Sequence, residues 1–137
     1  FKKDISLSIV GMEKDVKKTI KQENVNILEI ETSEDKLIEL YDNHDIFILP
    51  SFTEGHPQVL LESLARSRPV IIFEEISHVV GSKKGIFIAK RNSESLLEKI
   101  KYIGSNYGKI QEDMKNNNLP LKKEFLKDLE NLIVKIN

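Results

Sequence analysis

The sequence has no cysteine and no long apolar run, and these absences set the first limits on its function. A chain without cysteine can form neither a disulfide framework nor a thiolate metal site, and it fits a reducing compartment, so we expect a cytoplasmic location. The longest apolar stretches, such as residues 69–73, are far too short to cross a bilayer, and residues 1–4 are not a signal sequence. We therefore expect no direct membrane span.

A strong excess of either charge is also missing. The 137 residues include 21 Lys and Arg against 22 Asp and Glu, for a formal net charge of -1. Such a balance gives no electrostatic attraction to nucleic acid, so no nucleic-acid partner is expected. The three histidines, His44, His56 and His78, are scattered and have few carboxylates near them in sequence, so we expect no metal and no cofactor.

Short apolar runs and amphipathic stretches alternate along the chain, and 39% of its residues are apolar. This is the size and balance of one compact domain with a sizeable core. The pattern predicts strands at 5–10, 25–30, 45–49, 69–73 and 86–89, and helices at 15–22, 33–41, 57–67 and 93–102. Because such alternation is typical of parallel sheets covered by helices, we expect an α/β, Rossmann-like parallel sheet with helices on both faces.

The alternating pattern weakens beyond Gly104, which suggests a boundary there. We assign residues 1–104 to a Rossmann-like domain and residues 105–137 to a helical extension. A last amphipathic helix is expected at about 121–136, with one apolar side. Since the chain begins abruptly at a strand, we expect a segment of a longer enzyme, with the extension packed on the same domain or on a missing amino-terminal domain.

The segment whose residues are most suited to binding a ligand follows the third expected strand. It reads Leu49-Pro-Ser-Phe-Thr-Glu-Gly-His-Pro-Gln-Val-Leu-Leu-Glu62 and forms a polar loop directly before a helix. In open α/β sheets, ligands bind at this edge, beyond the carboxyl ends of the strands. Pro57 suits the first helical turn, where neighbouring amides point toward an anion such as a diphosphate. Gly55 has no Cβ, so the backbone can approach a ligand closely.

Two carboxylates flank this helix start. Glu54 precedes the helix, and Glu62 lies roughly 7.5 Å beyond Pro57 along the axis, at about 1.5 Å per residue. They could bracket a phosphate, one reaching a sugar and the other a ribose diol. Alternatively, Glu62 forms an ion pair with Arg66 worth about 0.2–0.5 kcal/mol, and Glu54 is a loop carboxylate favoured by the helix dipole. His56 could either touch the ligand or merely fill the loop.

The run Ser51-Phe-Thr-Glu54-Gly-His-Pro-Gln-Val-Leu-Leu-Glu62-Ser-Leu-Ala-Arg-Ser-Arg-Pro69-Val-Ile resembles the E-x7-E signature of glycosyltransferase family 4, the group 1 transferases. The similarity covers roughly residues 5 to 104. It implies one half of a two-domain GT-B enzyme that retains anomeric configuration, needs no metal and binds its nucleotide-sugar donor in the carboxyl-terminal domain. The chain would then be the donor domain of a hexosyltransferase of polysaccharide biosynthesis that acts on a glycan or lipid-linked acceptor, and it would be inactive alone.

The resemblance also implies roles for individual residues. Glu62 would hold the ribose hydroxyls, and Glu54, the candidate catalytic residue, would face the donor hexose. The amides around Gly55, His56 and Pro57 would meet sugar and phosphate oxygens, with Val59 and Leu60 near the phosphates and ribose.

Three features depart from the family pattern. The family's basic pair for the diphosphate, which normally precedes the first strand, is not found in this chain. Ser67 stands where a Gly usually precedes Pro-Val, and Glu29 stands where a Gly often follows the second strand. The departure at Glu29 concerns the edge of the site that would bind the nucleotide base of the donor.

Two other classes of function fit the same pattern. One is a nucleotide-sugar epimerase of similar two-domain architecture, and the other is a non-catalytic nucleotide-binding module that has lost transfer chemistry. The presence of both Glu54 and Glu62 argues against the second alternative.

Overall fold

The computed structural model describes residues 5–11, 23–120 and 127. It divides into two compact units, Phe1–Glu39 and Leu40–Asn137, and each is described here by itself. The helix expected at 15–22 lies outside the described residues, as does the helix expected at about 121–136, apart from Lys127. Among the described helices, none is both long enough and apolar enough to cross a membrane.

The first unit contains a two-stranded parallel sheet. Strand β1 (Leu7–Val10) runs beside β2 (Val25–Leu28), with Leu7 opposite Val25. Helix α2 (Glu34–Asp42) follows Ser33, whose carbonyl accepts a hydrogen bond from the Leu37 amide at 2.9 Å, and it runs across the division between the units. The types of these elements agree with the sequence pattern, although both strands are shorter than expected.

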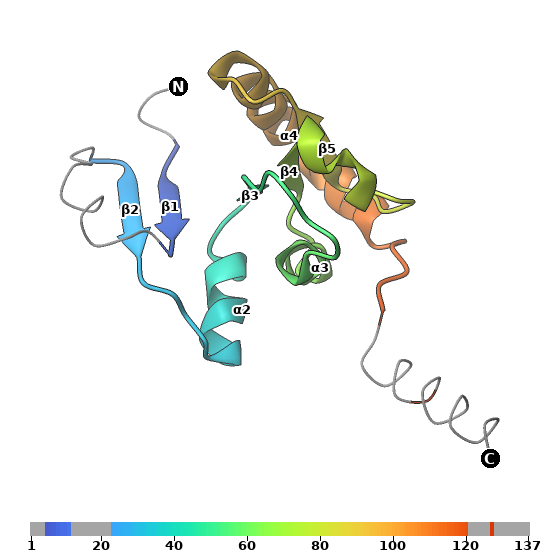
Figure 1. Cartoon of the computed structure of the whole chain (residues 1–137), viewed down its shortest axis with the longest axis horizontal. Helices are drawn as coiled ribbons and strands as arrows, with labels where there is room; N and C mark the ends of the chain where they lie inside the picture. The colour runs from blue at the N-terminus through green and yellow to red at the C-terminus, as the bar shows by residue number, and fades with distance from the viewer. Residues whose placement is uncertain (1–4, 12–22, 121–126, 128–137) are drawn as a thin grey trace. The chain divides into compact units, whose positions relative to one another are not determined.

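The second unit is built on a three-stranded parallel sheet in the order β3-β4-β5 (Figure 1). The strands are β3 (Phe47–Leu49), β4 (Val70–Phe73) and β5 (Ile86–Ala89). All four residues of β4 are buried, so the central strand is covered on both faces, as expected for a parallel sheet flanked by helices. The prediction of a parallel α/β arrangement is confirmed.

The core of this unit joins β4 to three helical segments, which are α3 (Gln58–Ala65), the 3-10 helix η1 (Glu74–Val79) and α4 (Ser93–Met114). Leu60 and Leu64 of α3 are 1% and 2% exposed, and Ile76 of η1 is fully buried. The segment after β4, for which the sequence pattern predicted neither a helix nor a strand, therefore begins with a helical turn anchored in the core.

Helix α4 is longer than the sequence pattern indicated. It was expected to end at about residue 102, but it continues to Met114 through one non-helical residue, Asn106. Ile103, Ile110 and Met114 are buried against the sheet, so tertiary packing sustains a helix whose glycines lower its local propensity. Residues 105–114, assigned above to an extension, thus contribute to the core of this unit.

The end of α3 explains one of the departures from the family pattern. The Ser67 amide bonds to the Leu64 carbonyl and the Arg68 amide to the Ser63 carbonyl, both at 2.9 Å. This is a Schellman motif, which requires a left-handed residue at the first position beyond the helix cap. Ser67 occupies that position with a φ of 54°. Glycine adopts this conformation without strain, which accounts for a glycine being usual there.

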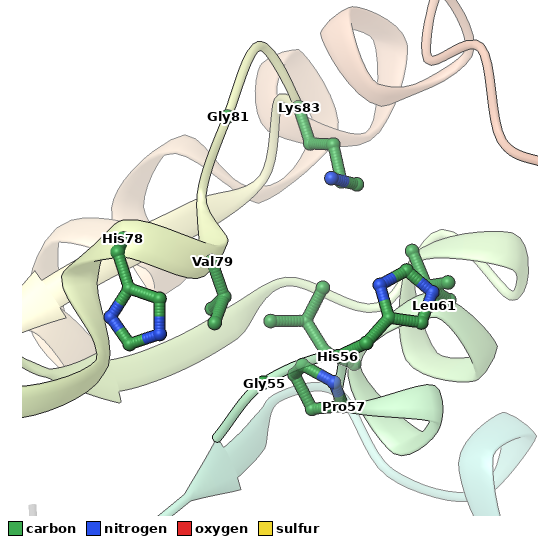
Figure 2. A pocket seen from close by; sticks show the side chains of 9 residues that line it. Gly55, His56, Pro57, Leu61, His78, Val79, Gly81 and Lys83 are labelled. Carbon is green, nitrogen blue, oxygen red and sulfur yellow. The ribbon is translucent and has the colours of Figure 1, made fainter. Parts of the chain in front are cut away.

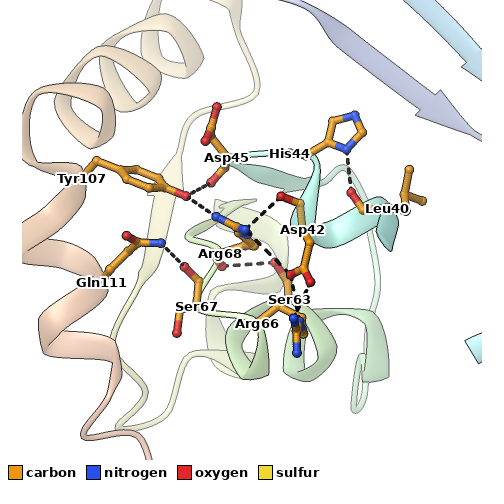
Figure 3. Close-up of polar contacts among 10 residues, drawn as sticks. All are labelled: Leu40, Asp42, His44, Asp45, Ser63, Arg66, Ser67, Arg68, Tyr107 and Gln111. Carbon is orange, nitrogen blue, oxygen red and sulfur yellow. Dashed lines mark hydrogen bonds and ion pairs between the residues drawn. The ribbon is translucent and has the colours of Figure 1, made fainter. Parts of the chain in front are cut away.

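A polar network then ties this turn to α4 and β3 (Figure 3). Arg68 donates through Nη1 to the Tyr107 hydroxyl at 3.1 Å, and that hydroxyl donates to the Asp45 carbonyl at 3.0 Å. Gln111 donates to the Ser67 carbonyl at 3.1 Å. These bonds fix the start of β3 and the end of α3. They therefore hold both ends of the segment from β3 to α3, which carries the candidate site.

Candidate functional site

The polar loop of residues 50–57 connects β3 to α3 and lies at the carboxyl edge of the parallel sheet. Pro57 is the N-cap of α3, with φ -71° and ψ 107°, so it stands just before the helix rather than in its first turn. Within the described residues, no side chain caps α3, whereas Asn92 caps α4 by accepting from the Ser95 amide at 2.8 Å. The Leu60 amide bonds to the Pro57 carbonyl at 3.2 Å, and the amides that precede it in α3 remain available to an external acceptor.

A hollow of about 200 Å³ opens beside this helix start (Figure 2). One side is formed by residues of the loop and α3, and the other by the segment that follows β4. The described residues that line it include no Asp or Glu, and they are Gly55, His56, Pro57, Leu60, Leu61, His78, Val79, Gly81 and Lys83. A cation and two imidazoles without an opposing carboxylate, beside a helix start that no described side chain caps, favour an anionic ligand.

Glu54 is held at both its backbone and its side chain. Its carbonyl lies 2.7 Å from His78 Nε2, and because a carbonyl only accepts, Nε2 must carry the proton. Its carboxylate accepts from the Ser51 hydroxyl at 2.6 Å. The loop therefore presents Glu54 in one orientation, with the second carboxylate oxygen left for another donor.

Glu62 is oriented by a tyrosine from the end of α2. The Tyr41 hydroxyl lies 3.1 Å from Glu62 Oε2 and 3.3 Å from the Val59 carbonyl. Burial raises the pKa of the Tyr41 phenol above its ordinary value of 10.0, and the Glu62 carboxylate raises it further. The phenol therefore keeps its proton and can donate a hydrogen bond to the Glu62 carboxylate.

The alternative pairing of Glu62 with Arg66 is not the one that forms. Arg66 instead makes a two-pronged ion pair with Asp42, in which Nε donates to Oδ1 at 2.9 Å and Nη2 donates to Oδ2. The exposed Glu62 carboxylate keeps the tyrosine as its hydrogen-bond donor, which leaves lone pairs for a diol.

Four of the seven residues selected from the sequence line the hollow, and these are Gly55, His56, Pro57 and Leu60. Leu60 is only 1% exposed, so most of its side chain belongs to the core. Glu54 reaches a lining residue through its bond to His78, whereas Val59 and Glu62 meet at Tyr41.

Three residues that the sequence analysis did not select contact the loop of residues 50–57 or line the hollow beside it. His78 was considered only as a metal ligand, and within the described part of the chain no three His, Cys, Asp or Glu residues are grouped to hold a metal. Lys83 lies between two glycines in the loop before β5, and Arg91 lies just after β5. For His78 and Arg91 a signal was available, because loops at the carboxyl ends of parallel strands converge on one edge.

The chain is similar in sequence to known glycosyltransferases. Residues 2–119 match the family described as Glycosyl transferases group 1. A stretch of 67 residues, 47% of this chain and 18% of the relative, is 31% identical to the N,N'-diacetylbacillosaminyl-diphospho-undecaprenol alpha-1,3-N-acetylgalactosaminyltransferase of Campylobacter jejuni. A stretch of 58 residues, 41% of this chain and 15% of the relative, is 36% identical to a protein of Bacillus subtilis. That protein is named as the teichuronic acid biosynthesis glycosyltransferase TuaC. The matched stretches thus span less than a fifth of either relative.

Proposed function

The chain belongs to the group 1 glycosyltransferases, and from this premise we propose that it forms the donor-binding domain of a retaining, metal-independent enzyme that transfers a hexose from a nucleoside-diphosphate sugar. The acceptor in this proposal is a glycan or a lipid-linked sugar, held by an amino-terminal domain outside this chain. The names of the two relatives, one containing diphospho-undecaprenol and the other teichuronic acid, support such an acceptor. Both relatives are named as transferases, which favours transfer over epimerisation.

The observation that carries the proposal is the hollow at the start of α3. It combines uncapped helix amides with Lys83, and a diphosphate needs both hydrogen-bond donors and positive charge. The Lys83 side chain reaches toward the hollow from the segment opposite the loop (Figure 2). In this proposal, Lys83 supplies a positive charge to the diphosphate from the segment between β4 and β5.

The remaining parts of the donor are assigned around this diphosphate position. Glu62, already oriented by Tyr41, accepts hydrogen bonds from the ribose hydroxyls, with Val59 and Leu60 beside the ribose and phosphates. Glu54, fixed by Ser51 and His78, faces the hexose. The amides around Gly55, His56 and Pro57 meet sugar and phosphate oxygens. The chain alone is expected to transfer no sugar, and the cysteine-free sequence supports a cytoplasmic enzyme.

Titration calorimetry with UDP, GDP and ADP, and with the corresponding nucleotide sugars, tests this arrangement. A charge-assisted hydrogen bond contributes about 1.5–3 kcal/mol, so Glu62→Gln should weaken nucleoside-diphosphate binding roughly tenfold or more. Glu54→Gln should leave the nucleoside diphosphate unaffected and weaken only the nucleotide sugar, because its partner is the hexose. A chelator should change neither affinity.

The role of Lys83 has a matched control in its neighbour. Lys83→Gln should weaken diphosphate binding severalfold, with a smaller effect at high salt, whereas Lys84→Gln removes the same charge from outside the hollow and should leave binding unchanged. If both substitutions weaken binding equally, only net charge matters and the assignment of Lys83 is wrong. If none of the three nucleotides binds at millimolar concentration, the proposal of a donor site fails.

A further inference from the structure

Arg91 reaches back from the end of β5 to the first residues of the polar loop. Its Nη1 donates to the Pro50 carbonyl at 3.1 Å, and its Nη2 donates to the Ser51 carbonyl at 2.9 Å. These two carbonyls belong to the residues that directly follow β3. One side chain thus joins the carboxyl ends of the two edge strands of the sheet.

The guanidinium is held in place by a carboxylate from the segment after β4. Nε donates to Glu75 Oε1 at 2.8 Å and Nη2 donates to Oε2 at 3.3 Å, and this interaction lowers the pKa of the Glu75 carboxyl below its ordinary range. With the two loop carbonyls, four of the five N–H groups of Arg91 have acceptors. Such a planar fork holds its acceptors in a fixed geometry, which a lysine cannot do.

Two aromatic rings complete the surroundings of Arg91. Its guanidinium carbon lies 3.9 Å from the centroid of the Phe52 ring and 4.3 Å from that of Phe73. Phe52 is 67% exposed, so this contact lies on the surface of the loop and not in the core. Cation–π attraction to the exposed Phe52 ring holds this loop residue against the arginine, and the buried Phe73 ring supports the guanidinium as well.

We propose that Arg91 is a positioning residue for the donor sugar, acting through Ser51 on Glu54. Arg91 fixes the Ser51 backbone, and the Ser51 hydroxyl in turn holds the Glu54 carboxylate at 2.6 Å. The inference rests on the proposed function, in which Glu54 faces the hexose. The nucleoside diphosphate is assigned to Glu62, Lys83 and the start of α3, whereas the described contacts of Arg91 are with residues 50–52, Phe73 and Glu75, so the influence of Arg91 is confined to the sugar.

The experiment measures how much the hexose adds to affinity, as the ratio of the Kd of a nucleoside diphosphate to the Kd of its nucleotide sugar. Calorimetry on the whole chain compares Arg91→Gln and the milder Arg91→Lys with Lys90→Gln, which removes a neighbouring charge. Both Arg91 variants should lower this ratio toward that of Glu54→Gln and leave the Kd of the nucleoside diphosphate within twofold of the unsubstituted chain. Lys90→Gln should change neither quantity.

A double-substitution cycle separates positioning from general stability. Because both substitutions disable the same carboxylate, Arg91→Gln combined with Glu54→Gln should lower the ratio no further than Glu54→Gln alone. Additive losses, or equal weakening of the nucleoside diphosphate and the nucleotide sugar by Arg91→Gln, would overturn the inference.

Amide hydrogen exchange tests the contact without any ligand. Exchange at residues 51–55 should be faster in Arg91→Gln than in Lys90→Gln, and equal exchange would show that Arg91 does not fix the loop. If the unsubstituted chain binds neither nucleoside diphosphates nor nucleotide sugars, the proposed function fails and the positioning role fails with it. If it binds both but its affinity ratio is insensitive to Arg91, the proposed function stands and this inference alone is wrong.

Discussion

Ser67 offers the most direct test of how α3 is terminated. Its φ of 54° places a side chain in the left-handed region, at the position of the Schellman motif that follows α3. This conformation costs a residue with a Cβ about 1–2 kcal/mol. Replacement by glycine removes that cost but gives the unfolded chain extra freedom worth about 0.5–1 kcal/mol. Ser67→Gly should therefore stabilise the protein by about 0.5–1 kcal/mol.

Chemical denaturation at constant pH would measure this difference, and thermal unfolding should show a midpoint about 1–4 °C higher for a chain of this size. The matched control is Ser67→Ala, which keeps the Cβ and hence the strain. The described hydrogen bonds of Ser67 use its backbone, so the alanine variant should stay within about 0.5 kcal/mol of the unsubstituted protein. If glycine destabilises the protein, or if alanine stabilises it as much as glycine does, the left-handed turn is not the reason for a glycine at this position.

Two further predictions concern stability. Gly85 has a φ of 86°, and a Cβ added there would lie 2.6 Å from Cγ of the buried Met114, so Gly85→Ala should cost about 2–4 kcal/mol in denaturant unfolding, from backbone strain and overpacking together. Gly104→Ala, where a Cβ meets open space on α4, should instead stabilise by about 0.5–1 kcal/mol, and equal effects at the two glycines would contradict this reasoning. Folding raises the pKa of Tyr41 above its unfolded-state value of 10.0, so the protonated phenol contributes to stability. This contribution is fully present below pH 10 and is lost as the pH rises above that value. Unfolding measured between pH 8 and 11 should therefore show a steeper alkaline loss for the unsubstituted protein than for Tyr41→Phe, and parallel curves would refute the assignment.

Local spacing along the chain was enough to predict much of the fold. The alternation of short apolar runs with amphipathic stretches predicted the described strands and α-helices in the right order and the parallel direction of the strands, but not the 3-10 helix η1. The loop before α3 lies at the carboxyl edge, as the order of strand and helix required. The resemblance to the group 1 transferases was confirmed by the family match over residues 2–119. These features depend on neighbours a few residues apart, so a single sequence carries them.

The partners of the candidate site residues were decided only by the tertiary structure. The sequence offered Arg66, four residues away, as the partner of Glu62, but the fold brings Tyr41 to this carboxylate and Asp42 to Arg66. The same reason explains the underestimated length of α4, because its glycines weaken the local signal while Ile110 and Met114 find a buried surface on the sheet.

Arg91 shows the difference between what the sequence determines and what the tertiary structure determines. Its acceptors at Pro50 and Ser51 lie about 40 residues away in sequence, and they become neighbours only because β3 and β5 flank β4 in one parallel sheet. The sequence by itself determined the loop, its glycine and its two carboxylates, since these follow one another along the chain. Which cation lies near the hollow, and which arginine holds the loop, depended on the order of strands across the sheet, a property that local spacing does not encode.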